Sequence, residues 1–214
     1  RTGGGTARQP VGPPARRRHW WITGAAVLIL LGTGAAWWAT QPRLTFANQL
    51  ADTVAVQVGG ENRTLPPGRS FSQTLSRGRA STLSWRLVRR RTSAGAVGVT
   101  FGDTITIVDR GRVRLAATAR PTRGAYFAPL ITNETGRPLT ITVNAGLGAA
   151  LPCDCTVPPG AMRMGIGYYP LFENSTVRAE DRASGRSATF RDLGRQVEVS
   201  RGTVGLLFRA GDLK

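Results

Sequence analysis

The sequence predicts an all-β extracytoplasmic part, built from two tandem β-sandwiches, that follows one N-terminal transmembrane helix. Three observations predict this organisation: an uncharged run of 24 residues near the N-terminus, period-two alternation of apolar residues beyond it, and similarity between two parts of that later region. The expected segments are a Gly/Pro/Arg-rich tail over residues 1–18, the helix over 19–42, and sandwiches over 43–122 and 123–214.

Residues 19–42 contain no Asp, Glu, Lys or Arg. They are long enough to cross a hydrocarbon core of roughly 30 Å at about 1.5 Å per residue. A cleaved signal peptide is the alternative, because arginines followed by an apolar stretch also fit such a signal. Tryptophan pairs bracket the run, as aromatic belts do at two membrane interfaces, and one pair occupies the place of a small-residue cleavage site, which favours an uncleaved anchor. These residues are Trp20, Trp21, Trp37 and Trp38.

Positive charge before the span predicts its orientation. Arg16, Arg17 and Arg18 directly precede it, whereas the far side has only Arg43 nearby. The positive-inside rule therefore places the N-terminus in the cytoplasm and the later domains in the periplasm or outside. The basic residues are 28 Arg and one Lys, a skew typical of GC-rich coding, so we expect a bacterial inner membrane.

Small residues within the span indicate a packing face. Gly24, Gly32 and Ala36 would permit close approach of another helix, and the last two are four residues apart on one helix face. The alternative is that glycine and alanine are simply common in membrane helices.

Alternation of apolar and polar residues predicts half-buried strands beyond the anchor. No window there has a convincing helical period, and Pro and Gly are frequent, as the turns of a sandwich require. The predicted strands are Thr53–Val58, Thr82–Val88, Thr104–Val108, Val113–Ala117, Leu139–Val143, Gln196–Ser200 and Val204–Phe208.

The region beyond the anchor contains an internal duplication. Asn48 and the strand after it align with Asn133 at an offset of 85, and Leu65–Gly68 aligns with Val157–Gly160, both ending in Pro-Pro-Gly, at an offset of 92. Residues 110–115 have their counterpart at an offset of 91. Each copy has the length of an immunoglobulin-like or transthyretin-like sandwich with six or seven short strands.

A seven-residue insertion in the second copy contains two cysteines, and all four sulfur-bearing residues lie close together. They are Cys153, Cys155, Met162 and Met164. Thiolate and thioether ligands together suit Cu(I), so a copper carrier is a minor hypothesis. The alternatives are a disulfide in an oxidising compartment, free thiols in a turn, and methionines in the core. We expect no metal and no cofactor.

The formal net charge of +17 indicates an anionic partner. Arginines cluster in two stretches that we expect to contact lipid headgroups or acidic surfaces of another subunit. The alternative is a solvated basic face. We expect no nucleic-acid partner, because the predicted location is extracytoplasmic and no aromatic residues interleave with the basic ones. The candidate contact residues are Arg86, Arg89, Arg90, Arg91, Arg112 and Arg114.

Composition argues against catalysis. The single histidine is His19, so the region beyond the anchor cannot hold a Ser-His-Asp or Cys-His system or a histidine-based metal site. We therefore expect a non-enzymatic protein.

The leading functional hypothesis is a structural or accessory subunit that stabilises a larger membrane complex. The helix flanked by tryptophan pairs, followed by two sandwiches, resembles accessory subunits of bacterial photosynthetic reaction centre–light-harvesting complexes. That resemblance implies a chain placed between the reaction-centre core and its antenna ring. The alternative is an envelope module that binds a glycan or a protein partner in an exposed groove, with Trp85, Tyr126, Tyr168 and Tyr169 as candidate residues.

Overall fold

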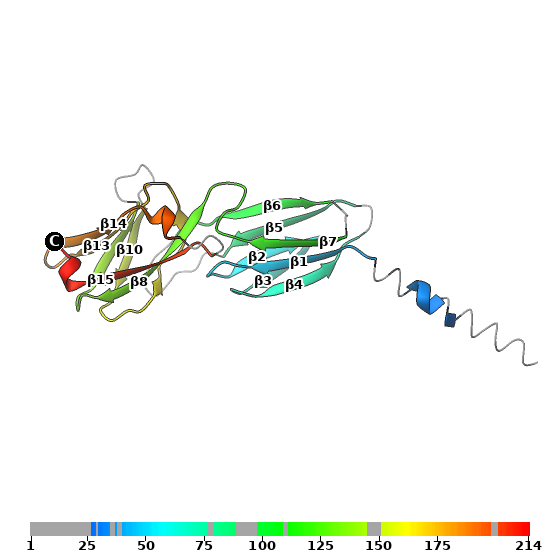
Figure 1. Ribbon diagram of the computed structural model, residues 1–214, viewed down its shortest axis with the longest axis horizontal. Coiled ribbons are helices and arrows are strands. Elements are labelled where there is room, and N and C mark those ends of the chain that lie inside the picture. The colour runs from blue at the N-terminus through cyan, green and yellow to red at the C-terminus, as the bar shows by residue number, and fades with distance from the viewer. Residues whose placement is uncertain are drawn as a thin grey trace, which may run out of the picture. The chain divides into compact units, whose positions relative to one another are not determined.

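The computed structural model describes residues 27–28, 30–34, 37, 40–76, 79–88, 98–108, 111–144, 151–197 and 201–214. These residues form fifteen strands and two short 3₁₀ helices, which confirms the all-β prediction for the region beyond the anchor (Figure 1). The chain divides into two compact units, Arg1–Gln41 and Pro42–Lys214.

Most of the predicted transmembrane segment lies outside the described residues. Within it, residues 27–28, 30–34 and 37 are helical, which includes Gly32 and Trp37, whereas residues 40–42 are not. Within the residues that the structure describes, no helix combines the length and the apolar character needed to cross a membrane. The remaining anchor residues lie outside the described part, namely Arg16, Arg17, Arg18, Trp20, Trp21, Gly24, Ala36 and Trp38.

The first half of the unit Pro42–Lys214 consists of two sheets around one core. One sheet has the order β4-β1-β7 and the other the order β3-β2-β5-β6. Alternate residues face inward, so that Leu44 and Phe46 from the first sheet meet Val56 and Leu83 from the second in one buried cluster. The strands are β1 (Arg43–Asn48), β2 (Val54–Val58), β3 (Glu61–Leu65), β4 (Ser70–Thr74), β5 (Ser81–Leu87), β6 (Gly102–Ile107) and β7 (Arg112–Ala117).

The second half repeats this arrangement. The sheet β10-β9-β13-β14 faces a sheet in which β8 pairs with β11, β12 and β15, around a second buried cluster. The strands are β8 (Tyr126–Glu134), β9 (Leu139–Val143), β10 (Leu151–Val157), β11 (Met164–Gly165), β12 (Tyr169–Pro170), β13 (Val177–Asp181), β14 (Arg186–Phe190) and β15 (Thr203–Arg209).

The pairing register repeats between the two halves, as the internal duplication predicts. In each half the first strand pairs in parallel with the last, β1 with β7 and β8 with β15. Phe46 lies opposite Leu115 in the first half, and Ile131 lies opposite Leu206 in the second. These equivalent pairs reproduce the sequence offsets of 85 and 91.

A buried asparagine explains why both copies keep the same turn. Asn48 is 1% exposed and Asn133 is fully buried. Each side-chain amide donates to the carbonyl four residues later and to the carbonyl that precedes Pro-Pro-Gly, at Leu65 or Val157. Each Oδ1 accepts from the backbone amide two residues later. The side chain therefore satisfies buried backbone groups of two separate segments.

The strand predicted over Gln196–Ser200 is wrong at its start. Gln196 and Val197 are not in a strand; they follow the 3₁₀ helix η1 (Leu193–Arg195), and the Val197 amide donates to the Leu193 carbonyl at 3.2 Å. Asp192 has a φ of 55°, which turns the chain, and the buried Leu193 anchors the turn in the core. Residues 198–200 lie outside the described part of the chain.

Tyr168 joins the two halves of the unit. Its hydroxyl accepts a hydrogen bond from the Ala51 amide and donates one to the Arg201 carbonyl, both at 2.8 Å. Its ring meets Phe101 edge-on, and Phe101 stacks on Tyr126 with 4.0 Å between ring centroids. Residues of the second half thus complete the core of the first.

Candidate functional site

The outer face of the sheet β3-β2-β5-β6 is hollowed into a groove of about 970 Å³. We call it the sheet groove. Its lining comes from all four strands and from the linker between the two halves. The side chains on its outward positions are Ala55, Gln57, Asn62, Thr64, Ser84, Arg86 and Thr104, and the linker adds Thr122 and Arg123.

The floor of the sheet groove is low because its central side chains are small. Val56 and Trp85 point into the core, so their neighbours Ala55 and Ser84 face outward. Gly102 pairs with Arg86 in the next strand. A Cβ at Gly102 would collide with the Trp85 carbonyl oxygen, so the close approach of these two strands requires glycine there.

The lining of the groove has more arginines than carboxylates, with Arg63, Arg86 and Arg123 against Asp103. Arg86 on β5 lies opposite Ala55 and Gly102 in the pairing register, at the centre of the sheet. It is exposed and forms no ion pair within the described residues. Around it, Ser84 and Thr104 offer hydroxyl groups that both donate and accept hydrogen bonds.

Asp103 fastens the linker to the rim of the groove. One carboxylate oxygen accepts from the Thr122 hydroxyl at 2.7 Å and from the Thr122 amide at 3.0 Å, and the other accepts from the Thr104 amide at 2.8 Å. Partial burial acts to raise the pKa of Asp103, but these hydrogen bonds outweigh it. The positive charge of Arg123 lowers the pKa further, so the pKa of Asp103 lies below its ordinary value and the carboxylate is ionised at neutral pH.

The predicted basic contact residues do not form one surface. Arg86 lies in the sheet groove, whereas Arg112 and Arg114 lie on β7 in the opposite sheet, in register with Arg43 and Thr45. The other three predicted arginines, Arg89, Arg90 and Arg91, lie outside the described residues. Sequence reasoning missed Ser84, Gly102, Thr122 and Arg123, because only strand pairing brings them together.

The aromatic candidates belong to the core. Trp85, Tyr168 and Tyr169 are buried, and Tyr126 is half-buried against Phe101. Their burial means that these side chains stabilise the cores and are not available as exposed binding residues. A ligand in the sheet groove would meet polar side chains and no exposed ring of these four residues.

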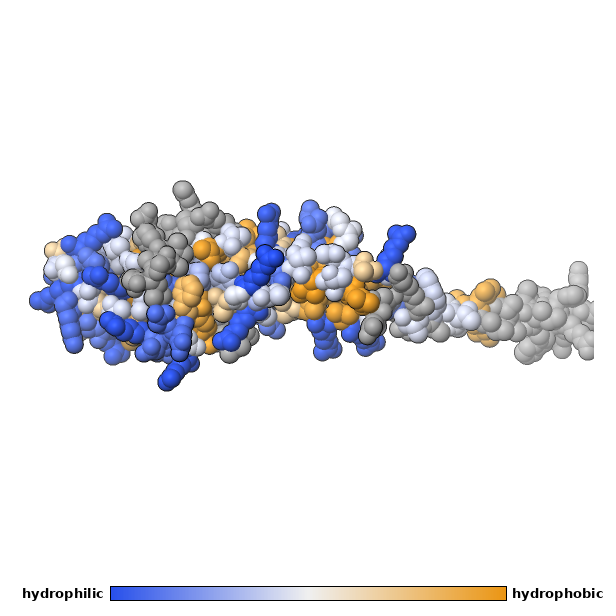
Figure 2. Space-filling model, turned by 90° about the horizontal axis from the view of Figure 1, so that it is seen from above, coloured by the Kyte–Doolittle hydropathy of each residue, from blue (hydrophilic) through white to orange (hydrophobic). Residues whose placement is uncertain are grey.

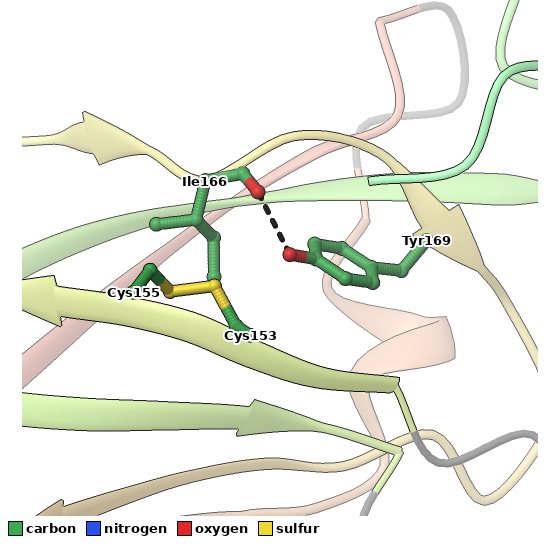
Figure 3. The surroundings of a disulfide bond; sticks show 4 residues. All are labelled: Cys153, Cys155, Ile166 and Tyr169. Carbon is green, nitrogen blue, oxygen red and sulfur yellow. Dashed lines mark hydrogen bonds between the residues drawn. A yellow bond between two sulfur atoms is a disulfide. The ribbon is translucent and has the colours of Figure 1, made fainter. Parts of the chain in front are cut away.

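The sulfur cluster contains a disulfide between Cys153 and Cys155 (Figure 3). In β10, Pro152 pairs with Thr142 and Thr156 with Thr140, so three residues of β10 face one residue of β9. The bulge brings the two cysteine Cα atoms to 4.9 Å, closer than successive same-face residues of a regular strand, which lie roughly 6.6 Å apart. The disulfide therefore closes the bulge.

The disulfide corrects the copper hypothesis. Thiolates are the ligands that Cu(I) prefers, and both sulfur atoms are consumed by the bond. Met162 is 82% exposed and Met164 pairs with Ile131 in the sheet, so the methionines do not enclose a site. Among the described residues no group of three His, Cys, Asp or Glu could hold a metal ion.

Comparisons with known proteins assign no family to the chain. No protein-family model matches the chain, and no curated protein matches it. Among solved structures, the chain is similar to a protein from Bacteroides ovatus that is provisionally named an adhesin. The identity is 11%, the match covers 79% of this chain and 87% of that one, and the TM-score is 0.35. A match at this level carries no argument about function.

Proposed function

We propose that this chain is a non-catalytic, membrane-anchored envelope protein whose first half binds a polar, anionic ligand in the sheet groove. The observation that carries the proposal is Arg86, which forms no ion pair with any described residue and lies at the centre of a sheet face whose neighbouring side chains are small or hydroxyl-bearing. The predicted bacterial membrane anchor supplies the location.

The side chains of the groove suit an acidic glycan. Hydroxyl and amide groups of Ser84, Gln57 and Asn62 match the alternating donors and acceptors of sugar hydroxyls. The guanidinium of Arg86 can bind a carboxylate with two parallel hydrogen bonds. A neutral sugar would leave that charge without a counter-ion, so we favour a uronate-containing chain over a neutral one.

A double substitution tests the groove while keeping the fold. Ser84→Arg with Arg86→Glu installs the residues that the second half has at the equivalent positions, which pair as Arg178 and Glu180 there. We expect binding of a polyuronate to the full chain in detergent, measured by calorimetry, to weaken about tenfold or more, because hydrogen bonds to a charged group contribute about 1.5–3 kcal/mol each.

The matched control exchanges the pair of the second half. Arg178→Glu with Glu180→Arg keeps net charge and leaves the sheet groove untouched, so we expect unchanged polyuronate binding. Equal affinities of both variants and the unsubstituted chain would contradict the proposal. Circular dichroism confirms that each variant is folded.

The second candidate function is that of a structural subunit of a membrane complex, such as the reaction centre–light-harvesting complex whose accessory subunits the sequence resembles. We also propose that each half has an immunoglobulin-like or transthyretin-like fold. The junction at Tyr168 favours the structural role, because hydrogen bonds to Ala51 and Arg201 would let the two halves act as one stiff spacer. Extraction in mild detergent tests this role: a chain that migrates alone at monomer size on a native gel is not such a subunit.

A further inference from the structure

The end of the first half at which the chain enters β1 has a distinct chemistry (Figure 1). The Arg43 amide donates to the Gly111 carbonyl at 3.0 Å, and the Leu75 amide donates to the Pro42 carbonyl at 2.9 Å. These bonds place the starts of β1 and β7 and the end of β4 at one end of the sandwich. We call this end, with Arg43, Arg79, Arg112, Arg114 and the hairpin turn Gly59-Gly60, the basal surface.

A pocket of about 350 Å³ opens on the basal surface. It is lined by the turn Gly59-Gly60, by Arg79 and by the hydroxyl-bearing residues Ser76, Ser81 and Thr82. Gln57 and Ser84 line both this pocket and the sheet groove. Both turn glycines have positive φ, 57° and 88°, as a two-residue hairpin turn requires. Hydroxyl groups beside a guanidinium form a set of hydrogen-bond donors that fits a phosphate group.

Positive charge dominates this end. Among the described acidic residues, Glu61 follows the turn directly, and its carboxylate is already paired with Arg63 at 2.7 Å. Arg79 and Arg112 are exposed and form no ion pair within the described residues. The positive charge extends onto the sheet β4-β1-β7, because Arg43 of β1 and Arg112 of β7 are paired neighbours there.

An apolar side chain accompanies the arginines. Val108 follows β6 and is 59% exposed, and the preceding Ile107 pairs with Ser81 beside the pocket. Figure 2 shows further apolar surface on the first half between projecting hydrophilic side chains. Arginines and apolar residues side by side are typical of surfaces that lie at the boundary between lipid headgroups and acyl chains.

We infer that the basal surface binds the phosphate headgroups of anionic lipids in the membrane that anchors the chain. Arg43 directly follows the predicted span over residues 19–42, so this end of the sandwich would lie within a few residues of the bilayer. The inference rests on the predicted anchor and on Arg79 and Arg112, neither of which lines the sheet groove, although the basal pocket shares Gln57 and Ser84 with that groove. Each arginine near an anionic bilayer is worth about fivefold in binding.

Hydrogen–deuterium exchange of the full chain in nanodiscs tests the inference. One set of nanodiscs contains phosphatidylcholine alone, and the other contains equal parts of phosphatidylcholine and phosphatidylglycerol. We expect the amides of Gly59-Gly60 and of residues 79–82 to exchange about threefold or more slowly in the anionic nanodiscs, and high salt to remove this difference. Arg79→Glu with Arg112→Glu should abolish it, whereas Arg182→Glu with Arg186→Glu, on the exposed β13–β14 turn, should not.

Each other outcome overturns the inference. A chain that stays out of the nanodiscs overturns the anchor and the lipid surface together, and leaves the sheet groove unaffected. A chain that incorporates but exchanges equally in both lipids overturns the lipid surface alone. Equal slowing by inorganic phosphate in phosphatidylcholine nanodiscs would show that the pocket takes phosphate from solution, and would overturn the commitment to lipid.

Discussion

Equivalent strands of the two halves pair in the same order, yet the side chains at equivalent outward positions differ in charge and size. In the first half, the outward positions of β5 hold Ser84 and Arg86. In the second half, the equivalent positions of β13 hold Arg178 and Glu180, whose charged groups lie 3.4 Å apart. The second face therefore has an ion pair of two long side chains at these positions, whereas the first has a serine and an arginine that forms no ion pair within the described residues.

The comparison teaches which residues belong to the shared scaffold. The buried asparagine, the Pro-Pro-Gly turn and the parallel pairing of first and last strands occur in both halves, so they are requirements of the fold. Residues that differ at equivalent outward positions are free of that requirement. Ser84 and Arg86 are thus available for binding.

We expect the largest loss of stability when one of the two buried asparagines, which both halves share, is replaced. Asn48→Ala removes two donated bonds and one accepted bond in the core, and leaves backbone groups unpaired. We expect the free energy of unfolding to fall by about 3 kcal/mol, since each buried unsatisfied group costs about 1–3 kcal/mol. Asn133→Ala should cost more, because Asn133 also donates to Pro158 and accepts from the Thr135 hydroxyl.

Urea unfolding followed by circular dichroism measures both losses. The control is Asn62→Ala, which removes an exposed asparagine of the sheet groove and should change stability by less than about 0.5 kcal/mol. If both buried asparagines behaved like Asn62, the turn would not depend on them, and the duplication would have lost its structural explanation.

A smaller effect is expected at two adjacent tyrosines that act at different places. Tyr168 bonds across the junction, whereas the Tyr169 hydroxyl donates to Ile166 at 2.8 Å inside the second half. Tyr168→Phe should destabilise the chain by about 2 kcal/mol, because it removes two hydrogen bonds across the junction and each has a usual net value of about 1 kcal/mol. Tyr169→Phe should cost about 1 kcal/mol, the usual net value of one hydrogen bond.

Coupling between the halves distinguishes the two tyrosine variants. We expect Tyr168→Phe to split thermal unfolding into two transitions in a scanning calorimeter, and Tyr169→Phe to lower the melting temperature with a single transition. A split transition in both variants would show that any loss of core stability separates the halves, and would remove the special role of the junction.

Parts of this architecture follow from the sequence and others do not. The strands β2, β5 and β9 were predictable, because one face of each is buried and their apolar residues alternate. β3 and β4 were missed, since they are largely exposed edge strands with polar residues on both faces. The groove needs Ala55, Ser84 and Gly102 to be neighbours, and their contact depends on pairing registers between distant segments, which composition does not encode.

We expect the smallest loss of stability when the disulfide of the second half, which has no counterpart in the first half, is removed. Arg63 of β3 lies opposite one residue of β2, whereas Cys153-Asp154-Cys155 of β10 lies opposite one residue of β9. The bulge therefore accounts for two of the seven inserted residues, and the other five lengthen the turn that precedes β10. A disulfide that spans so few residues restricts the unfolded chain little. The loop-entropy relation gives about 1.5 kcal/mol for it, below the value of about 2–4 kcal/mol typical of longer loops.

Reduction with a thiol reagent, or Cys153→Ser with Cys155→Ser, should therefore lower the free energy of unfolding of the second half by about 1.5 kcal/mol. The first half has no counterpart, so ligand binding in the sheet groove should not change. A loss of binding on reduction would mean that the bulge communicates with the groove through the junction, and the assignment of separate roles to the two halves would fail. An unchanged free energy would mean that the bulge is held by its buried packing, because Cys153 and Cys155 are 4% and 1% exposed.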